Sequence, residues 1–552
     1  MCRDSLINKK TVESNNFKDN VSERDQSNIH DLNKETKHDD STERKPPSKK
    51  KRRGQRDRTF DQPSGPKYKK VEADDNITSA LFSVGVILVI GCAYAAIKGW
   101  RGRISVAGID LGTTNSVICI QALSRSVGEI DCISDPYSGS PLIPSVVSFE
   151  EFNTNDLNEL KPIVGRAASE RMNAHARSTV SLAKRFLGRS FGDDVVRDQA
   201  LEVEFEVVED TEGISLVEEF AEKGGIAFRI QPPHSNVEPK LFSPEMIGSY
   251  VVKHLINLTN NFLGYENIKS AVIAVPAKFT MLQRQATAQA FKLAGIKVAR
   301  VLEEPVAAAL AYGLHRKPDV DHILVYDFGG GTLDVSILMV SEGFVDVMAS
   351  EGDDTLGGAD FDAAIAHSLM EKSEYAEILA ILAKAEAYIS SRISENVLDV
   401  EEFLMENCPK IDDMPLCSSS SFHTIGEKMK IQLSSSNVAN ESCMGLKNVD
   451  ISQIGGVDEL CQSLSPIHLS FTSDDFLNSS ARLLERSRIP IRNVLSSMDL
   501  NPGDIDEVVM VGGTSRMPVV RELVKDELQV QNLNTSIDPD ITVAYGCASV
   551  ID

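Results

Sequence analysis

Two glycine-containing segments of the chain place acidic and hydroxyl side chains in the same arrangement. The first, SVAGIDLGTTNSVICI over 105–120, is an apolar strand that ends in Asp110 and turns through Gly112, Thr113 and Thr114 into a second apolar strand. Such a hairpin can present backbone N–H and hydroxyl groups to a phosphate, while its carboxylate points at the accompanying cation. By itself, it could equally be an ordinary glycine-containing hairpin.

The second segment, ILVYDFGGGTLDVSILM over 323–339, repeats this layout with Asp327, glycines at 329–331, Thr332 and Asp334. Consecutive glycines let backbone amides approach a triphosphate closely, and a simple flexible turn does not require a carboxylate at both ends. Two such hairpins are more specific than one. They predict two similar lobes that face a shared cleft.

A third segment, VVMVGGTSRMP over 508–518, reads as a buried strand followed by Gly512, Gly513 and Arg516. Paired glycines at the end of a strand let a flat ring approach the backbone, and an arginine can stack on that ring. An ordinary strand–helix turn is the alternative. The chain contains no GxxxxGK[ST] motif and no GxGxxG that opens a helix after a strand, which argues against P-loop and dinucleotide-binding enzymes.

Composition and charge narrow the class of protein. The chain has 552 residues, 42% of them hydrophobic, enough for two to four domain-sized units. Its formal net charge is -24, but residues 1–76 carry 19 Lys and Arg against 15 Asp and Glu, a net of +4 that leaves -28 for the remainder. A globular part this acidic repels nucleic acid, so we expect no nucleic-acid partner.

The nine cysteines form no CxxC pair and no Cys/His ligand spacing, so the sequence does not indicate a zinc site. Four of them lie between 408 and 461. They could pair if that region faces an oxidising lumen, or they could be scattered free thiols.

The N-terminal region predicts a tail and a membrane span. Residues 1–76 are poor in aromatic side chains and rich in Asn, Asp, Ser and Lys, so we expect them to be disordered. Residues 77–97 contain no charge, and a helix of this length, rising about 1.5 Å per residue, crosses a hydrocarbon core of about 30 Å. A cleaved signal peptide is the alternative, but the preceding tail is too long for an ordinary one.

Basic residues near the predicted span favour one orientation. The run KKKRR over 49–53 could be read as a nuclear address, but beside a span it favours a topology determinant or a surface for anionic lipid. Trp100 follows the span at interfacial depth. We expect a cytosolic N-terminus and a lumenal large domain in a single-pass protein.

From residue 104 onward, short apolar β-type runs alternate with amphipathic helical stretches, which predicts an α/β architecture. Together with the three glycine-rich segments, this region resembles the ATPase domain of the 70-kDa heat-shock protein family, from about residue 106 to the end of the chain. Six further segments carry the resemblance: IPSVVSF (143–149), VSLAKRFLGRSF (180–191), AVIAVPAKFTMLQRQAT (271–287), VLEEPVAAALAYGL (301–314), LGGADFD (356–362) and DPDITVAYG (538–546).

The resemblance implies an actin-like ATPase fold with two lobes of similar core around a nucleotide cleft. It places lobe I at 104–317, lobe II at 318–535 and a helix at 536–552 that returns to lobe I. The region near 390–465 is rich in Ser, Glu and Asp, which predicts a partly ordered insertion within lobe II. Relatives continue into a peptide-binding domain, which we do not expect in this chain. This layout is similar to that of a microsomal family member that consists of the ATPase core, and a truncated gene model would look the same.

The resemblance also implies roles for individual residues. Asp110 and Asp327 hold the water shell of Mg²⁺ and of a neighbouring K⁺, and Lys184 places and polarises the attacking water. Glu304 and Asp334 are the remaining catalytic carboxylates, with Asp334 the better candidate to orient that water. The residues implied to contact ATP or ADP are Gly112, Thr113, Thr114, Asn115, Gly329, Gly330, Gly331, Thr332, Glu427, Lys430, Ser434, Gly512, Gly513, Arg516 and Asp540.

One position of the implied adenosine pocket departs from the family pattern. Ile431 stands where relatives usually carry an arginine that stacks on adenine, and loss of that contact weakens binding by about 0.5 to 2 kcal/mol.

We therefore expect a membrane-anchored, ATP-hydrolysing chaperone-family switch in quality control at the endoplasmic reticulum, with J-domain or exchange-factor partners. The alternative is a weakly hydrolysing, nucleotide-bound scaffold or exchange-factor-like protein. The VPAKF and EEPVAAALAYGL segments argue against a sugar kinase or a filament former of the same fold superfamily.

Overall fold

The computed structural model divides the chain into two units, Met1–Ser79 and Ala80–Asp552. The first unit, and with it the predicted disordered tail, lies outside the described residues. The described residues are 83–92, 105–121, 129–152, 160–172, 175–201, 203–215, 217, 224–232, 238–265, 267–372, 375, 408, 414–446 and 456–551.

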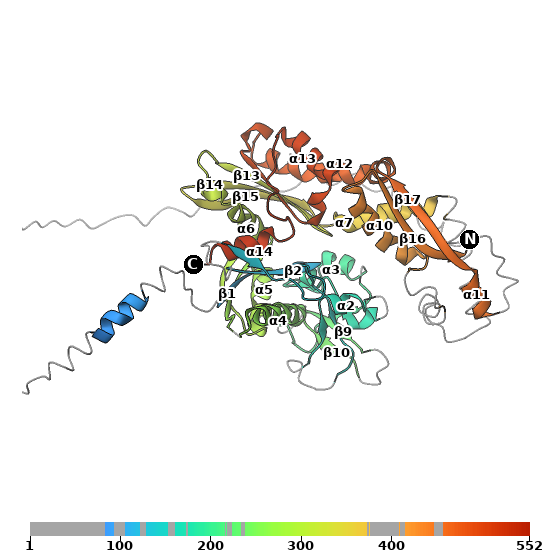
Figure 1. Cartoon of the computed structure of the whole chain (residues 1–552), viewed down its shortest axis with the longest axis horizontal. Coiled ribbons are helices and arrows are strands. Elements are labelled where there is room, and N and C mark those ends of the chain that lie inside the picture. The colour runs from blue at the N-terminus through green and yellow to red at the C-terminus, as the bar shows by residue number, and fades with distance from the viewer. Residues whose placement is uncertain are drawn as a thin grey trace, which may run out of the picture. The chain divides into compact units, whose positions relative to one another are not determined.

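The first large sheet has the strand order β12-β11-β1-β2-β3, and β4 also pairs with β2. Its strands β1 and β2 are labelled in Figure 1. The hairpin predicted from 105–120 is present as antiparallel β1 and β2, and β11 and β12 extend the sheet beside β1 in parallel. We call the region built on this sheet lobe I. Its strands are β1 (Val106–Asp110), β2 (Asn115–Gln121), β3 (Ile130–Cys132), β4 (Ile143–Pro144), β11 (Ser270–Val275) and β12 (Lys297–Glu303).

Two capped helices cover one face of this sheet, α4 (Pro244–Leu263) and α5 (Met281–Leu293). The Ser243 hydroxyl accepts the Met246 N–H at the start of α4, and Thr280 forms a capping box with Gln283 at the start of α5. Smaller elements complete lobe I: β5 (Val147–Ser148), β6 (Ile163–Val164), α2 (Arg166–Ser169), η1 (Ala176–Ser178), β7 (Thr179–Val180), η2 (Ala183–Phe186), α3 (Asp194–Gln199), β8 (Glu206–Glu209), β9 (Ile226–Ile230) and β10 (Lys240–Phe242).

The second large sheet, the base of lobe II, has the order β15-β14-β13-β18. It repeats the pattern of the first sheet, because β13 and β14 form an antiparallel hairpin and β18 joins β13 in parallel. The α/β fold with two similar cores is therefore confirmed. The strands are β13 (His322–Phe328), β14 (Leu333–Ser341), β15 (Phe344–Asp353) and β18 (Glu507–Val511).

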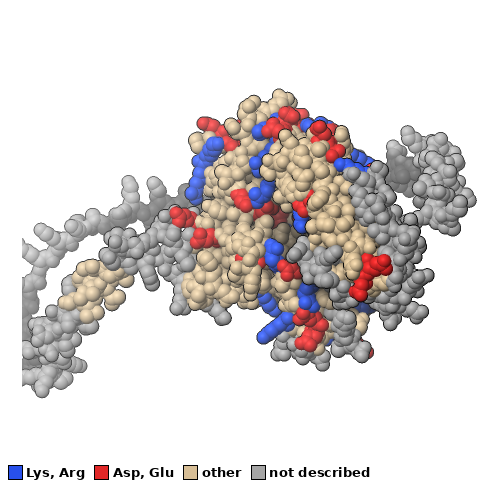
Figure 2. All heavy atoms as spheres, turned by 45° about the vertical axis from the view of Figure 1, so that its right-hand side comes forward, with Lys and Arg blue, Asp and Glu red and all other residues tan. Residues whose placement is uncertain are grey.

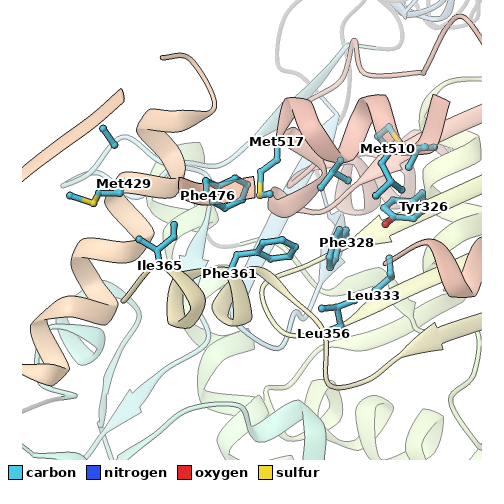
Figure 3. Close-up of a cluster of buried hydrophobic side chains, with 14 of the residues drawn as sticks. Tyr326, Phe328, Leu333, Leu356, Phe361, Ile365, Met429, Phe476, Met510 and Met517 are labelled. Carbon is cyan, nitrogen blue, oxygen red and sulfur yellow. The ribbon is translucent and has the colours of Figure 1, made fainter. Parts of the chain in front are cut away.

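Helices and a hairpin pack against the second sheet. Phe361 on α7 stacks on Phe476 of α12 with ring centroids 6.0 Å apart, next to Phe328 of β13 (Figure 3). Within the predicted insertion, α10 and β16 contribute buried side chains to this core. The elements are α7 (Gly358–Glu371), α10 (Ser419–Leu433), β16 (Val438–Leu446), α11 (Val457–Ser463), β17 (Leu464–Thr472), α12 (Ser473–Ser497), η6 (Pro502–Asp504), η7 (Gly513–Arg516) and α13 (Pro518–Leu528).

Two helices join the lobes, α6 (Glu304–Ala311), which is followed by η4 (Leu314–Arg316), and α14 (Thr542–Ser549). Together with strands of both sheets they form a separate apolar cluster, which includes Val272 of β11 and Val325 of β13. The backbone of α14 approaches β1 so closely that a Cβ on Gly108 would lie 2.3 Å from the Ala548 nitrogen. The C-terminal helix thus packs on the first strand of lobe I.

The predicted membrane span, 77–97, lies largely outside the described residues. Residues 83–92 are helical and exposed. No helix within the described part of the chain combines the length and hydropathy needed to cross a bilayer.

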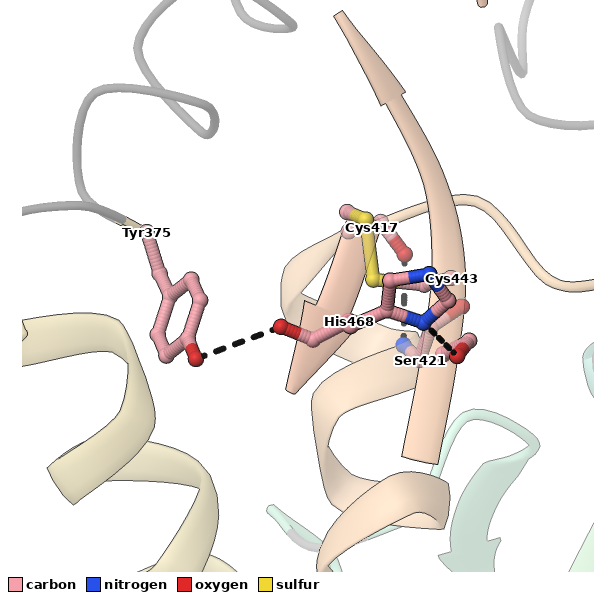
Figure 4. The surroundings of a disulfide bond; sticks show 7 residues. Tyr375, Cys417, Ser421, Cys443 and His468 are labelled. Atoms are coloured by element: carbon pink, nitrogen blue, oxygen red, sulfur yellow. Dashed lines mark hydrogen bonds between the residues drawn. A yellow bond between two sulfur atoms is a disulfide. The ribbon is translucent and has the colours of Figure 1, made fainter. Parts of the chain in front are cut away.

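Six cysteines form disulfides, Cys119–Cys132, Cys408–Cys461 and Cys417–Cys443. The first joins facing positions of β2 and β3. In the third, Cys417 just before α10 is bonded to Cys443 on β16 (Figure 4). The four cysteines between 408 and 461 are therefore paired.

Charged side chains are mixed on the surface. On the face shown in Figure 2, the described Lys and Arg side chains are interspersed with Asp and Glu. This distribution differs from the extended basic surface that nucleic-acid binding uses.

Candidate nucleotide-binding site

The turns of the two predicted hairpins converge on one cavity between the lobes. The β1–β2 turn and the β13–β14 turn face each other, because a Cβ on Gly330 would lie 3.3 Å from the Thr114 hydroxyl. Fifteen of the sequence-predicted residues line the cavity: Asp110, Gly112, Thr113, Thr114, Asn115, Lys184, Glu304, Asp327, Gly329, Gly330, Gly331, Thr332, Gly512, Gly513 and Asp540.

Hydrogen bonds fix the conformation of the glycine-rich turn after β13. The Gly329 N–H donates to the Thr332 carbonyl at 3.0 Å, and the Gly329 carbonyl accepts the Thr514 hydroxyl at 2.9 Å. The Gly330 carbonyl accepts the Ala359 N–H at the start of α7, at 2.8 Å. A turn held in this way can receive phosphate oxygens without first being ordered.

Two glycines lie at tight points around the cavity. A Cβ at Gly331 would lie 2.3 Å from the guanidinium of Arg185, which reaches from lobe I to the Gly331 carbonyl. Gly512 has φ of 79°, and a Cβ there would lie 2.4 Å from the Phe328 carbonyl oxygen. A larger residue at 512 would have a strained backbone and would collide with that carbonyl, whereas at 331 it would displace the flexible end of the Arg185 side chain.

Lys184 lies in the wall of the cavity and is held by one strong contact. It sits on η2, where its ammonium donates to Glu304 Oε1 at 2.7 Å, and the two side chains are only 9% and 14% exposed. Burial alone would lower the pKa of Lys184, but Glu304, Asp110 and Asp327 together raise it. The lysine is thus a fixed cation beside the phosphate-binding turns.

Three aspartates of the site have raised pKa values because burial disfavours their charged forms. The pKa of Asp110 is raised to about 7, with Lys184 opposing the effect and Glu304 adding to it. The pKa of Asp327 lies well above its ordinary value, because burial is reinforced by Glu304, Asp334 and Asp110. Burial likewise raises the pKa of Asp334 to about 6, although the neighbouring Lys278 ammonium lowers it.

This set of donors fits a hydrated divalent cation. Asp110 Oδ1 is buried and has no hydrogen-bond partner among the described residues, and a cation with its water shell would satisfy it. The described residues contain no cluster of three or more Asp, Glu, His or Cys arranged to ligate a metal directly. Asp110 and Asp327 are thus the residues that would hold a hydrated Mg²⁺ here.

Sequence reasoning missed three basic residues around the site. Arg185 lines the cavity next to Lys184, and Lys278 places its ammonium 3.4 Å from Asp334 Oδ1. Arg189 lines an adjoining cavity, together with Asp334. All three occur in LAKRFLGR and VPAKF, two segments that carry the family resemblance. Their basic side chains could have been predicted to lie near the phosphates for that reason.

The implied adenosine residues are brought together less completely. Glu427 and Lys430 lie on α10 and Ser434 is the C-cap of this helix, but none of the three lines the cavity. Lys430 forms an ion pair of 2.8 Å with Asp362 of α7. Ile431, on the same helix, is 62% exposed.

Arg516 lies outside the cavity lining and is bound by carboxylates. Its guanidinium donates to Asp540 Oδ2 at 2.8 and 3.0 Å and also contacts Asp538. These contacts orient the guanidinium plane at the end of η7, beside the glycines at 512 and 513. Asp540 itself lines the cavity.

Comparison with known proteins agrees with this geometry. The family model described as "Hsp70 protein" matches residues 106–434 and 418–551. The chain belongs to the Hsp70 family. Members of the Hsp70 family are ATPases that use Mg²⁺ and bind J-domain and exchange-factor co-chaperones.

Individual Hsp70 relatives match at moderate identity. Chaperone protein DnaK of Thermus thermophilus is 34% identical over 443 residues, which is 80% of this chain and 59% of that protein. Chaperone protein DnaK of Prochlorococcus marinus is 35% identical over 80% of this chain and 58% of its own length. The iron-sulfur cluster biogenesis chaperone of mitochondria in Saccharomyces cerevisiae is 33% identical over the same shares. The chain thus spans less than two thirds of the length of these Hsp70 proteins.

Proposed function

We propose that this chain binds ATP with Mg²⁺ between its two lobes and hydrolyses it to ADP and phosphate. The observation that carries the proposal is the convergence of the Asp110 and Asp327 turns on one cavity whose wall holds the Lys184–Glu304 pair. Catalysis of phosphoryl transfer consists chiefly of positioning and charge stabilisation, and these groups supply both.

Each group has a distinct role in this proposal. Glu304 holds the Lys184 ammonium, which places and polarises the attacking water, and Asp334 orients that water. Threonines 113, 114 and 332 and the amides of 329–331 bind phosphate oxygens. Bound Mg²⁺, with K⁺ nearby, supplies positive charge that neutralises the phosphates and permits Asp110 and Asp327 to be ionised together.

The setting that we propose is the membrane of the endoplasmic reticulum, with the ATPase domain in the lumen and a role in secretory-pathway quality control. The uncharged stretch 77–97 and the basic cluster before it support a single span with a cytosolic N-terminus. The three disulfides support an oxidising compartment for the large domain. J-domain and exchange-factor proteins would be its partners.

A second candidate function is a nucleotide-bound scaffold that hydrolyses ATP weakly. Two observations favour it: Ile431 exposes an aliphatic side chain where an adenine-stacking arginine is expected, and Lys430 is engaged with Asp362. Both would weaken the hold of α10 on the base, and neither affects the phosphate-binding turns.

The test is single-turnover hydrolysis of ATP by the full chain in detergent, compared with Lys184→Ala. We expect the variant to lose at least about a hundredfold in the hydrolysis rate, because the lysine acts on the attacking water, and to bind ADP nearly as tightly as wild type. Lys292→Ala, on the exposed face of α5, is the matched control and should retain wild-type turnover.

Two outcomes would count against the proposal. A wild-type rate in Lys184→Ala would remove this lysine from the mechanism. If wild type itself hydrolysed ATP no faster than the protein-free reaction while still binding ADP, the scaffold would be the better description.

A further inference from the structure

A second cavity of about 160 Å³ adjoins the nucleotide cavity. The two cavities share a wall. This wall includes Thr113 and Thr332, one residue from each phosphate-binding turn, so the terminal phosphate of ATP would lie against it. The wall consists of Thr113, Lys184, Arg185, Glu304, Asp327 and Thr332. Beyond it, the second cavity extends between α3, the β11–α5 loop and Asp334.

The cations of the shared wall are already engaged by neighbours. The Lys184 ammonium is bound to Glu304 at 2.7 Å. The Arg185 guanidinium donates to Gln199 Oε1 at 2.5 Å and to the Gly331 carbonyl at 3.3 Å. These two cations are therefore positioned by the protein before any ligand enters.

Two other cations line only the second cavity. The Nε of Arg189 is buried and has no hydrogen-bond partner, and within the described part of the chain this guanidinium forms no ion pair. The Lys278 ammonium lies 3.4 Å from Asp334 Oδ1, longer than the roughly 2.7–2.9 Å of a strong charge-assisted hydrogen bond. The Lys278 side chain is 38% exposed, so an incoming anion can reach it.

We propose that this second cavity binds inorganic phosphate and receives the phosphate product from the nucleotide cavity, an inference that rests on the proposed ATP hydrolysis. The product forms at the shared wall, so it can enter the second cavity without passing ADP. An arginine guanidinium matches the geometry of phosphate oxygens, and the Nε–H of Arg189 is a buried donor without a partner among the described residues.

Carboxylates limit how tightly this site holds its ligand. Glu304, Asp327, Asp334 and Asp354 line the same cavity and repel a phosphate dianion. Binding is therefore weak, as a release route requires. Arg189 and Lys278 provide the attraction that draws phosphate away from the nucleotide.

The experiment measures ³¹P line broadening of inorganic phosphate added to the full chain in detergent, saturated with Mg²⁺ and a non-hydrolysable ATP analogue. The analogue occupies the nucleotide cavity, so saturable broadening reports the second cavity. We expect Arg189→Gln to weaken phosphate binding roughly tenfold, because loss of one charge-assisted contact removes about 1.4 kcal/mol or more. Arg189→Lys should retain most of the affinity, and Lys292→Gln on exposed α5 should retain all of it.

The analogue is titrated separately by calorimetry, so a failure of nucleotide binding is detected directly and is distinct from a failure of phosphate binding. If Arg189→Gln does not fold, Lys278→Gln gives the same comparison from the other side of the cavity. No saturable broadening with wild type, or equal affinity in wild type and the folded Gln variant, would overturn the inference.

Discussion

A few charged residues determine the electrostatics of the nucleotide site. Asp110 and Asp327 lie near one buried cation, Lys184, which is already paired with Glu304, and Asp334 lies beside Lys278. Burial disfavours their charged forms and keeps the pKa values of the three aspartates high in the ligand-free protein, and neighbouring carboxylates add to this effect. A divalent cation would reverse this situation, because its charge favours their ionised forms.

Asp110→Asn tests the cost of burying this carboxylate in its charged form. Because the pKa of Asp110 is about 7 in the folded protein and 3.8 without perturbation, the folded state binds more protons between these values, and stability falls as pH rises through this window. The variant has no carboxyl group at position 110, so its stability does not fall in this way as the pH rises. We expect it to be more stable than ligand-free wild type at pH 8, by on the order of a few kcal/mol, and to differ little at pH 4.

Chemical denaturation at the two pH values measures the difference. The same variant should bind Mg²⁺–ADP more weakly than wild type, which separates the electrostatic effect from general stabilisation. An equal stability difference at both pH values would contradict the assignment of the raised pKa to Asp110.

Ile431→Arg tests the adenosine pocket. The side chain is 62% exposed on α10, so an arginine can be accommodated without disturbing the core. We expect ADP to bind roughly three- to thirtyfold more tightly, corresponding to a restored cation–π contact of about 0.5 to 2 kcal/mol. Titration calorimetry measures this, with Ile489→Arg on exposed α12 as the control for added charge. Unchanged or weaker binding would mean that α10 does not cover the base.

At the scale of elements, α10 depends on its attachments. Its first turn is capped by the Ser418 hydroxyl, which accepts the Ser421 N–H at 3.2 Å (Figure 4). Cys417, one residue earlier, is bonded to Cys443 of β16, so the helix start is tied to the β16–β17 hairpin. On its other side, the Lys430–Asp362 pair joins α10 to α7.

Cys417→Ser combined with Cys443→Ser tests the covalent attachment. Closing a loop with a separation of 26 residues restricts the unfolded chain, so the double variant should lose about 2–4 kcal/mol of stability. ADP binding should weaken as well, because α10 carries the implied adenosine residues.

Denaturation in oxidising and reducing buffers measures this loss. The difference in unfolding free energy between wild type and variant should disappear when both are reduced, which serves as the control. If the difference in unfolding free energy were equally large in the reducing buffer, the effect would come from side-chain packing and not from the disulfide.

At the scale of the whole molecule, the proposed lumenal domain makes glycosylation testable. Four Asn-X-Ser/Thr sequons lie after the predicted span. Asn257, Asn440 and Asn478 are exposed. The Asn534 amide instead donates to Glu507 Oε2 at 2.8 Å and to the Val508 carbonyl at 3.0 Å, which engages the nitrogen that a glycan would use.

Protease added to sealed microsomes should therefore digest about the first 76 residues and leave a protected, glycosylated fragment. Endoglycosidase should increase the mobility of this fragment, and Asn→Gln changes at 257, 440 and 478 should reduce that shift, whereas Asn534→Gln should not. Detergent-treated microsomes are the control. Complete digestion without detergent would place the ATPase domain in the cytosol.

The local sequence pattern was sufficient to predict the α/β fold class and the phosphate-binding chemistry of the two hairpins. A strand, a glycine turn and a second strand form a hairpin from short-range preferences, so Asp110, Thr113, Asp327 and Thr332 could be recognised from the chain alone. The repeat of that pattern predicted two lobes. The alternation of apolar β-type runs with amphipathic stretches predicted helices between the strands for the same reason, because this periodicity is local.

Only the tertiary structure decided which side chains meet across long separations. Lys278 pairs with Asp334, Lys430 with Asp362, and Arg189 lines a cavity with residues more than a hundred positions away. Pairing of the cysteines likewise depends on which strands and helices become neighbours. Such contacts follow from the packing of whole elements, which spacing along the chain does not encode, and charge and burial at each pair then set the pKa values.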